Sequence, residues 1–260
     1  MLGTIVMTVL LAGTPAPGEL VDNTPYAEVL STYVKDAKVD YAGLQKDRAK
    51  LDAYLAEIAG VSKASFDKAS REARAAYLIN AYNAYTLKSI IDNYPIKKSG
   101  GFFNTAPANS IKQIKGVWDT TKHKTALGEV TLDDIEHKNL RPKYDLALSH
   151  MGLVCASKGC PPLRAEPFTA DKLIQQLEDQ ARIYLASPYG LVVKGDDSIK
   201  VSMIFKWFAK DFTKEYGDAI GFVEKYAPAD KVDVVKKARR AGNVSYIDYD
   251  WSLNELKSGS

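Results

Sequence analysis

The sequence predicts a mixed α+β fold built around one buried helix. Residues 75–95, AAYLINAYNAYTLKSIIDNYP, are apolar nearly all round, and a helix that is apolar on every side belongs inside a fold. Patterns typical of hairpins occur at residues 117–130 and 190–208, between amphipathic helical segments. No repeat and no linker-like stretch interrupts residues 19–256, so we expect a single domain there.

The other elements follow in chain order. Residues 26–34 and 51–58 have the apolar spacing of amphipathic helices. The hairpin at 117–130 turns across Gly128, and Thr131 is then a credible N-cap for a helix that ends near Pro142.

The second half of the chain continues the alternation of helices and strands. Residues 146–154 read as a buried strand, and residues 169–186 as a helix capped by Thr169. A last hairpin turns at Gly195-Asp196-Asp197, and a further helical stretch precedes the closing segment VSYIDYDWSLNEL.

Composition excludes some classes of partner. The 260 residues carry a net charge of only +3, without a long run of Lys and Arg. Nucleic-acid binding usually leaves a clustered basic footprint, so we expect no nucleic-acid partner. The chain does not itself indicate an oligomeric state.

The first eighteen residues predict an export signal or a disordered tail. They carry no charged side chain, and residues 5–12, IVMTVLLA, form an apolar run too short for a stable membrane span. The positive start usual in such signals is missing, but small residues and prolines follow the run, which favours export to the periplasm or envelope. Residues 257–260 read as a tail.

The predicted helix after Thr131 carries the first candidate site. Leu132, Ile135 and Leu140 define its apolar face, and Glu136 lies on that same face beside His137. A buried carboxylate must find a partner or shift its pKa. Glu136 is therefore either paired with an arginine or part of an acid–base site, in which His137 is the best candidate base.

Two amides interrupt the central helix. Asn80 and Asn83 are three residues apart and project from one side of it. They either satisfy backbone groups of neighbouring loops, or orient a catalytic imidazole or an oxyanion. The remaining histidines are less promising: His123 lies in a hairpin that we expect to be exposed, and an extended strand would point His150 away from Cys155.

The only two cysteines lie in the stretch VCASKGCPPL, as Cys155 and Cys160. Cys155 opens a loop after a buried segment, where nucleophiles are often displayed, and Lys158 supplies a nearby positive charge. A turn could equally close the pair as a disulfide in an oxidising compartment. A metal site would need further ligands such as His137 and His150, so spacing favours it less.

The sequence resembles the family catalogued as domain of unknown function 547. The matching pieces are VDYAGL, YLINAYNAYTLKSII, TLDDIEHKNLR, HMGLVCASKGCPPLR, EPFTADKLIQQL and YDWSLNEL. The resemblance implies a fold similar to papain-like cysteine peptidases and transglutaminases, with a buried central helix and a small antiparallel sheet. It also implies Cys155 as nucleophile, His137 as base, and Glu136, Asn80 or Asn83 as orienting groups.

Three functions follow from these residues. The first is a thiol-dependent hydrolase or acyltransferase that acts on a peptide or a small amide or thiol substrate and needs no cofactor or metal. In this first function, Cys160 is the alternative nucleophile. The second is a non-catalytic envelope module whose Cys155–Cys160 disulfide pins the loop. The third is a metal protein that uses the same cysteines and histidines.

Overall fold

The computed structural model describes residues 13–99, 105–144 and 147–256. The predicted apolar run at residues 5–12 and the tail at 257–260 lie outside these ranges. Within them no helix has both the length and the apolar character needed to cross a membrane.

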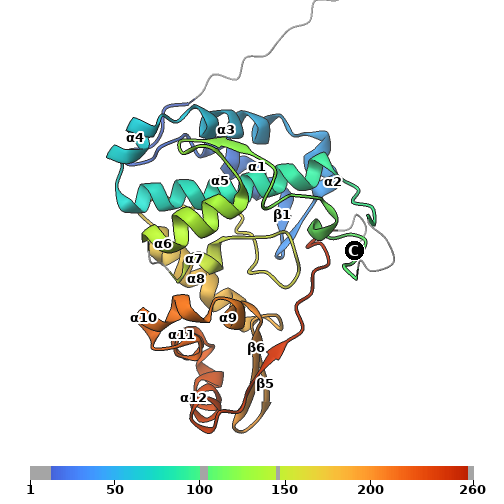
Figure 1. The fold of residues 1–260 in the computed structure, drawn as a ribbon, viewed down its shortest axis with the longest axis vertical. Helices are drawn as coiled ribbons and strands as arrows, with labels where there is room; N and C mark the ends of the chain where they lie inside the picture. Colours follow the sequence, from blue (N-terminus) through green and yellow to red (C-terminus); the bar gives the residue numbers. More distant parts are fainter. Residues whose placement is uncertain (1–12, 100–104, 145–146, 257–260) are drawn as a thin grey trace, which may run out of the picture.

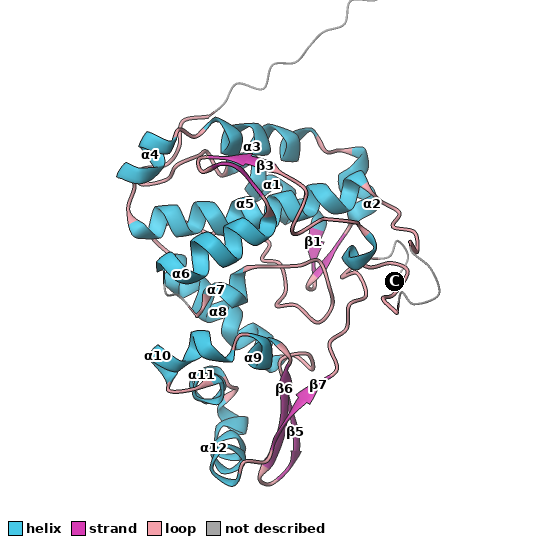
Figure 2. Cartoon of the chain, viewed as in Figure 1, coloured by secondary structure: helices cyan, strands magenta, loops and turns pink. Residues whose placement is uncertain are grey.

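Helices make up most of the fold (Figure 2). The helices of the first half of the chain are α1 (Thr24–Tyr33), α2 (Tyr41–Lys46), α3 (Ala49–Gly60), α4 (Lys63–Lys68), α5 (Arg71–Asp92), the 3-10 turn η1 (Ile111–Gln113), the π-helix η2 (Asp134–Leu140) and α6 (Arg141–Tyr144). Those that follow are α7 (Ser149–Gly152), α8 (Leu173–Ala186), α9 (Ile204–Trp207), η3 (Ala209–Phe212), α10 (Thr213–Tyr216), α11 (Ala219–Tyr226), η4 (Ala229–Lys231) and α12 (Val232–Ala241).

In the described ranges the strands are short and form three separate sheets. They are β1 (Val34–Lys35) with β2 (Lys38–Val39), β3 (His123–Thr125) with β4 (Gly128–Val130), and β5 (Leu191–Gly195) with β6 (Ser198–Ser202) and β7 (Val244–Ile247). The first two sheets are antiparallel pairs, whereas β7 runs parallel to β6. The fold is therefore α+β, as predicted.

Helix α5 is the predicted central helix. The Ser70 hydroxyl caps its start by accepting a hydrogen bond from the backbone N–H of Ala73, and all its residues from Ala75 to Leu87 are buried. Helices α1 to α4 surround it on one side, and α7, α8 and the β5–β7 sheet lie on the other (Figure 1). Such burial explains why its sequence shows no polar stripe.

The C-terminal segment returns from β7 to the N-terminal half of the fold (Figure 1). We call residues 248–256 the C-terminal strap. The N–H of Val39 donates to the carbonyl of Asn254, and the N–H of Leu256 donates back to the carbonyl of Val39. On its way the strap crosses the loop that carries both cysteines, which fixes the two segments against each other.

Several sequence predictions were wrong. Thr169 does not cap α8, which begins at Leu173 with Lys172 in the N-cap position and no side-chain cap. The stretch 146–154 contains the short helix α7 in place of a strand, because a short apolar run has no periodicity that separates the two. His123 is buried, with its ring stacked on Tyr85 at 4.3 Å, and not exposed. The largest sheet is mixed and not antiparallel, since β7 arises from a closing segment in which no strand was predicted.

Candidate active site

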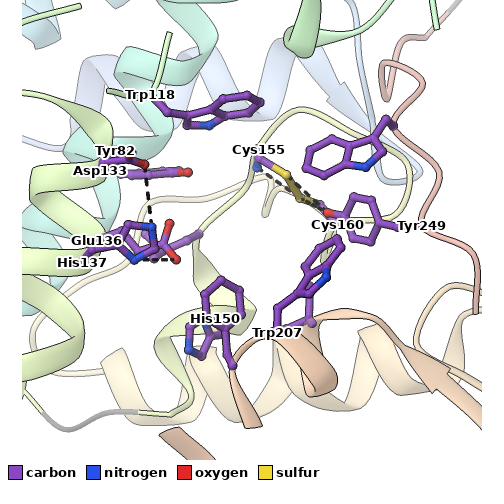
Figure 3. A pocket seen from close by; sticks show the side chains of 14 residues that line it. Tyr82, Trp118, Asp133, Glu136, His137, His150, Cys155, Cys160, Trp207 and Tyr249 are labelled. Carbon is purple, nitrogen blue, oxygen red and sulfur yellow. Dashed lines mark hydrogen bonds and ion pairs between the residues drawn. A yellow bond between two sulfur atoms is a disulfide. The ribbon is translucent and has the colours of Figure 1, made fainter. Parts of the chain in front are cut away.

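One pocket of about 200 Å³ collects most of the chemically interesting side chains (Figure 3). Its polar and sulfur-bearing lining is Asp133, Glu136, His137, His150, Cys155, Cys160 and Tyr249. Its aromatic lining also includes Tyr82, Trp118, Trp207, Phe208 and Trp251. The walls come from α5, η2, α7, residues 155–160 (the disulfide loop), α9 and the C-terminal strap. Distant parts of the sequence therefore meet in this pocket.

Cys155 and Cys160 form a disulfide that closes one wall of the pocket. Their Cα atoms are 6.4 Å apart, within the usual range for such a bond. Ala156, directly after Cys155, has a φ of +55°, a left-handed conformation that is costly for a residue with a Cβ. The loop therefore has to be held in shape by its surroundings.

The C-terminal strap supplies much of that support. The N–H groups of Lys158 and Gly159 donate to the carbonyls of Ser252 and Asp250, each at 2.9 Å. The N–H of Asn254 donates to the carbonyl of Ala156 at 3.2 Å. The strap thus pairs with the backbone of the disulfide loop along its length.

Tyr249 of the strap places its hydroxyl over the disulfide. The Tyr249 Oη lies 3.0 Å from the Cys160 Sγ and 3.3 Å from the Cys155 Sγ. The Ser157 hydroxyl donates to the same oxygen at 3.1 Å. Burial raises the pKa of Tyr249 well above its usual value, so the phenol keeps its proton and acts as a donor.

A cluster of aromatic rings surrounds Tyr249. Its ring centroid lies 4.9 Å from that of Trp207 and 4.6 Å from that of Trp251. Trp207 is nevertheless 45% exposed. Large exposed rings at the edge of a pocket are typical of ligand-binding surfaces.

Glu136 lines the pocket from η2. The helix begins with a reciprocal cap, in which the Asp134 N–H donates to the Thr131 hydroxyl and the Thr131 N–H donates to the Asp134 carboxylate. Thr131 is thus the helix cap predicted from the sequence, and π-helical turns such as η2 are frequent at functional sites. Burial raises the pKa of Glu136 to about 7, and the Arg141 cation offsets this only in part.

Behind Glu136, two histidines share one arginine–carboxylate pair. The Arg141 guanidinium donates two hydrogen bonds to the Asp211 carboxylate and one, at 2.8 Å, to the His137 Nδ1. The His150 Nε2 lies 2.8 Å from Asp211. Although burial opposes it, bonding to His150 and Arg141 holds the pKa of Asp211 well below its usual range.

These bonds fix where each imidazole carries its proton. An arginine can only donate, so the His137 Nδ1 is an acceptor and its Nε2 carries the proton, 3.7 Å from Asp133. A carboxylate can only accept, so the His150 Nε2 carries the proton. Burial lowers the pKa of both rings, which keeps them neutral near pH 7. The His150 Nδ1 is then a free acceptor, without a hydrogen-bond partner in the described parts of the chain.

Asn80 and Asn83 lie outside the pocket lining, and their amides bind loop backbone. Asn80 donates to the carbonyl of Phe168 and accepts from its N–H. Asn83 donates to the carbonyl of Gly152 and accepts from the N–H of Val154. Of the two open interpretations of these amides, the structure supports the one in which they satisfy neighbouring loops. Asn83 thereby positions the backbone immediately before Cys155.

The sequence pointed to Cys155, Cys160, Glu136 and His137, and the structure brings all four to one pocket. The sequence analysis did not place His150 in the site with Cys155, because the predicted strand turned that side chain away from the cysteine. Asp211 and Tyr249 carry no local motif, although the resemblance of YDWSLNEL to a known family was a signal that the C-terminal strap matters.

A metal site gains no support from this arrangement. Within the described ranges, no group of three or more His, Cys, Asp and Glu side chains gathers as a set of ligands. Both cysteine sulfurs are already joined to each other.

Comparison with known proteins gives one match. The model of the family described as "Protein of unknown function, DUF547" matches residues 66–185, which confirms the resemblance seen in the sequence. The matched region contains α5, η2, α7, the disulfide loop and most of α8. No curated protein and no solved structure matches the chain.

Proposed function

We propose that this chain, whose residues 66–185 belong to the DUF547 family, is a thiol-dependent hydrolase or acyltransferase that acts on peptide-like amide bonds. The observation that carries the proposal is the convergence of a disulfide, a carboxyl group of raised pKa and two neutral imidazoles on one pocket. Perturbed titratable groups that cluster in a pocket are typical of catalytic sites.

The nucleophile is Cys155, released when the disulfide is reduced. Its side chain is only partly buried, whereas Cys160 is 6% exposed, so Cys155 presents the more accessible sulfur. The Cys155 thiolate attacks the carbonyl carbon of the substrate, and the C–N bond breaks as a thioester forms. Water or an acceptor amine then attacks the thioester and restores the thiolate.

The opposite wall supplies the proton transfers. Near neutral pH the Glu136 carboxyl can hold the proton that the leaving amine needs. His137 presents its Nε2–H as a donor to the developing oxyanion, whereas His150, with its Nδ1 free, accepts the proton of the attacking water. The sequence had suggested His137 as the base, and the Arg141 hydrogen bond favours His150 for that role.

The fold and the location belong to the same proposal. The buried α5 helix beside a small sheet supports a papain-like or transglutaminase-like scaffold. The disulfide supports an oxidising compartment such as the periplasm or envelope, where such bonds persist. A peptide of the cell envelope is the substrate class that fits both.

The experiment is covalent labelling of the native protein. After mild reduction at pH 7, a small activated thioester should acylate Cys155, seen as one added acyl mass in intact-protein spectra and located by peptide mapping. Cys155→Ser should abolish the adduct. His150→Gln should slow its hydrolysis more than His137→Gln does. A folded, reduced protein that acquires no acyl group faster than free cysteine does would overturn the proposal.

A second function is favoured by the disulfide itself. A non-catalytic envelope module would need the Cys155–Cys160 bond only to pin the loop against the C-terminal strap. In that case the native disulfide should resist mild reduction, and alkylation should require unfolding. The aromatic cluster of Trp207, Tyr249 and Trp251 would then serve as a peptide-binding surface.

A further inference from the structure

The two sulfurs of the disulfide differ in the hydrogen-bond donors that surround them. The Cys160 Sγ accepts two hydrogen bonds, from the Tyr249 hydroxyl at 3.0 Å and from the backbone N–H of Cys155 at 3.2 Å. The Cys155 Sγ is near the same hydroxyl at 3.3 Å and the Ser157 hydroxyl at 3.4 Å. The Ser157 hydroxyl proton points to the Tyr249 oxygen.

We propose that Tyr249 directs thiol–disulfide exchange at this bond, so that an incoming thiol attacks Cys155 and Cys160 departs as the thiolate. The activity is distinct from the acyl chemistry proposed above, because it needs only the disulfide and a small external thiol. It can therefore hold even if no acyl substrate reacts.

The direction of the exchange follows from two differences between the sulfurs: how accessible each is to an external thiol, and how well each is stabilised as a leaving thiolate. The more exposed sulfur is the one an external thiolate can reach, and that is Cys155. The sulfur that leaves must carry a negative charge, and hydrogen bonds to an ionised group are roughly twice as strong as neutral ones. Cys160 already has two donors in place for that charge.

The bonds and charges balance in two steps. In the first, the external thiolate forms a mixed disulfide with Cys155, the Cys155–Cys160 bond breaks, and Cys160 keeps the electron pair as a thiolate. In the second, another external thiolate attacks the external sulfur of the mixed disulfide and frees the Cys155 thiolate. The external thiol is oxidised to its disulfide, and the protein is reduced.

Gly159 of the disulfide loop allows the Tyr249 ring to lie close to the two sulfurs. A Cβ on Gly159 would lie 3.1 Å from two ring carbons of Tyr249 and 3.0 Å from the backbone nitrogen of Asp250. The absence of a side chain at residue 159 therefore lets the ring approach the sulfurs. The strap and the disulfide loop are also paired through the Gly159 N–H and the Asp250 carbonyl.

Opening of the disulfide also links the exchange to the proposed nucleophile. No hydrogen bond joins either pocket histidine to either sulfur in the described ranges. The second exchange step itself leaves Cys155 as a thiolate, which is the form that the proposed acyl chemistry needs.

The first test uses the wild-type protein and glutathione. The oxidised protein is mixed with glutathione, quenched in acid within milliseconds to seconds, and mapped by mass spectrometry. We expect the glutathione mixed disulfide on Cys155. Glutathione found on Cys160, or on both cysteines equally, would overturn the proposal.

The second test isolates the donor to Cys160. In Cys155→Ser, the ultraviolet absorbance of the Cys160 thiolate, which needs no reagent to reach the buried sulfur, should rise with pH with a midpoint below the value of about 8.5 of a free thiol. Adding Tyr249→Phe should move that midpoint up by about one unit, since one hydrogen bond to the thiolate is lost. The matched control is Cys160→Ser with and without Tyr249→Phe, in which Cys155 should shift less.

An unchanged Cys160 midpoint in the Tyr249→Phe variant, or a Cys160 midpoint at or above that of a free thiol while the protein is folded, would refute the role of Tyr249. Circular dichroism of each variant confirms that it is folded. Acylation of Cys155 is measured separately, so failure of the acyl chemistry and failure of the directed exchange give different results.

Discussion

Replacement of Glu136 by glutamine should remove a specific dependence of stability on pH. Burial raises the pKa of this carboxyl from its usual 4.5 to about 7. The folded protein therefore binds the Glu136 proton more tightly than the unfolded chain does. The stability from this group is present in full below about pH 4.5 and is lost as the pH rises through about 7.

The magnitude follows from the size of the pKa shift. Each pKa unit corresponds to about 1.4 kcal/mol, so the contribution of Glu136 to the free energy of unfolding should fall by about 3 kcal/mol across this window. Glutamine stays neutral at every pH. The stability of Glu136→Gln relative to wild type should therefore rise by about the same amount from pH 4.5 to pH 8.

The assay is urea denaturation of both proteins at several pH values, with the linear extrapolation at each. Taking the difference between the two proteins cancels the titration of His137, His150 and the other carboxylates to first order. Glu129→Gln, which changes an exposed carboxylate of strand β4, is the matched control and should track wild type. A difference between Glu136→Gln and wild type that stays constant with pH would refute the buried, protonated state of Glu136.

Two further predictions concern the supports of the disulfide loop. Asn83→Ala should lower the free energy of unfolding by about 2–4 kcal/mol in urea denaturation, because the Gly152 carbonyl and the Val154 N–H lose their buried partner. The control Asn93→Ala breaks one part-buried bond at the end of α5 and should lower it by about 1 kcal/mol or less. Equal losses in the two variants would contradict the positioning role of Asn83. Reduction of the disulfide should lower stability by about 2 kcal/mol, the chain entropy of so short a loop, and should leave the far-ultraviolet circular dichroism unchanged; loss of the native spectrum would show that the bond is needed for the fold itself.

Much of the fold was predictable because strong local patterns dominate it. The continuous apolar character of residues 75–95 predicted α5, and the turn at Gly195-Asp196-Asp197 predicted the β5–β6 hairpin. The start of η2 was predictable too, since Thr131 makes its cap with a carboxylate three residues on. In each case the information lies within a few residues of chain.

The features that the sequence did not predict depend on contacts between distant segments. Strand β7 exists because it pairs in parallel with β6, which its own sequence does not indicate. His150 faces the pocket because α7 interrupts an apolar run that reads equally well as a strand. Asp211 becomes significant only through Arg141 and His150, which are 70 and 61 residues away.

The candidate site divides in the same way. Glu136 was recognisable as a carboxylate on an apolar helix face, and the cysteine pair was recognisable from its spacing. The choice between nucleophile and disulfide depended on the arrangement of the loop, which Asn83 and the C-terminal strap impose from far away in the sequence.

The most direct test of the proposed thiol chemistry is the alkylation rate of Cys155 in the native, mildly reduced protein at pH 7. Iodoacetamide labelling, followed by peptide mapping, should modify Cys155 faster in the folded protein than in the same chain unfolded in urea, because a pocket thiolate is the reactive form. Labelling of Cys155 only after the protein has been unfolded would contradict a catalytic thiol and would leave the disulfide as a structural clasp.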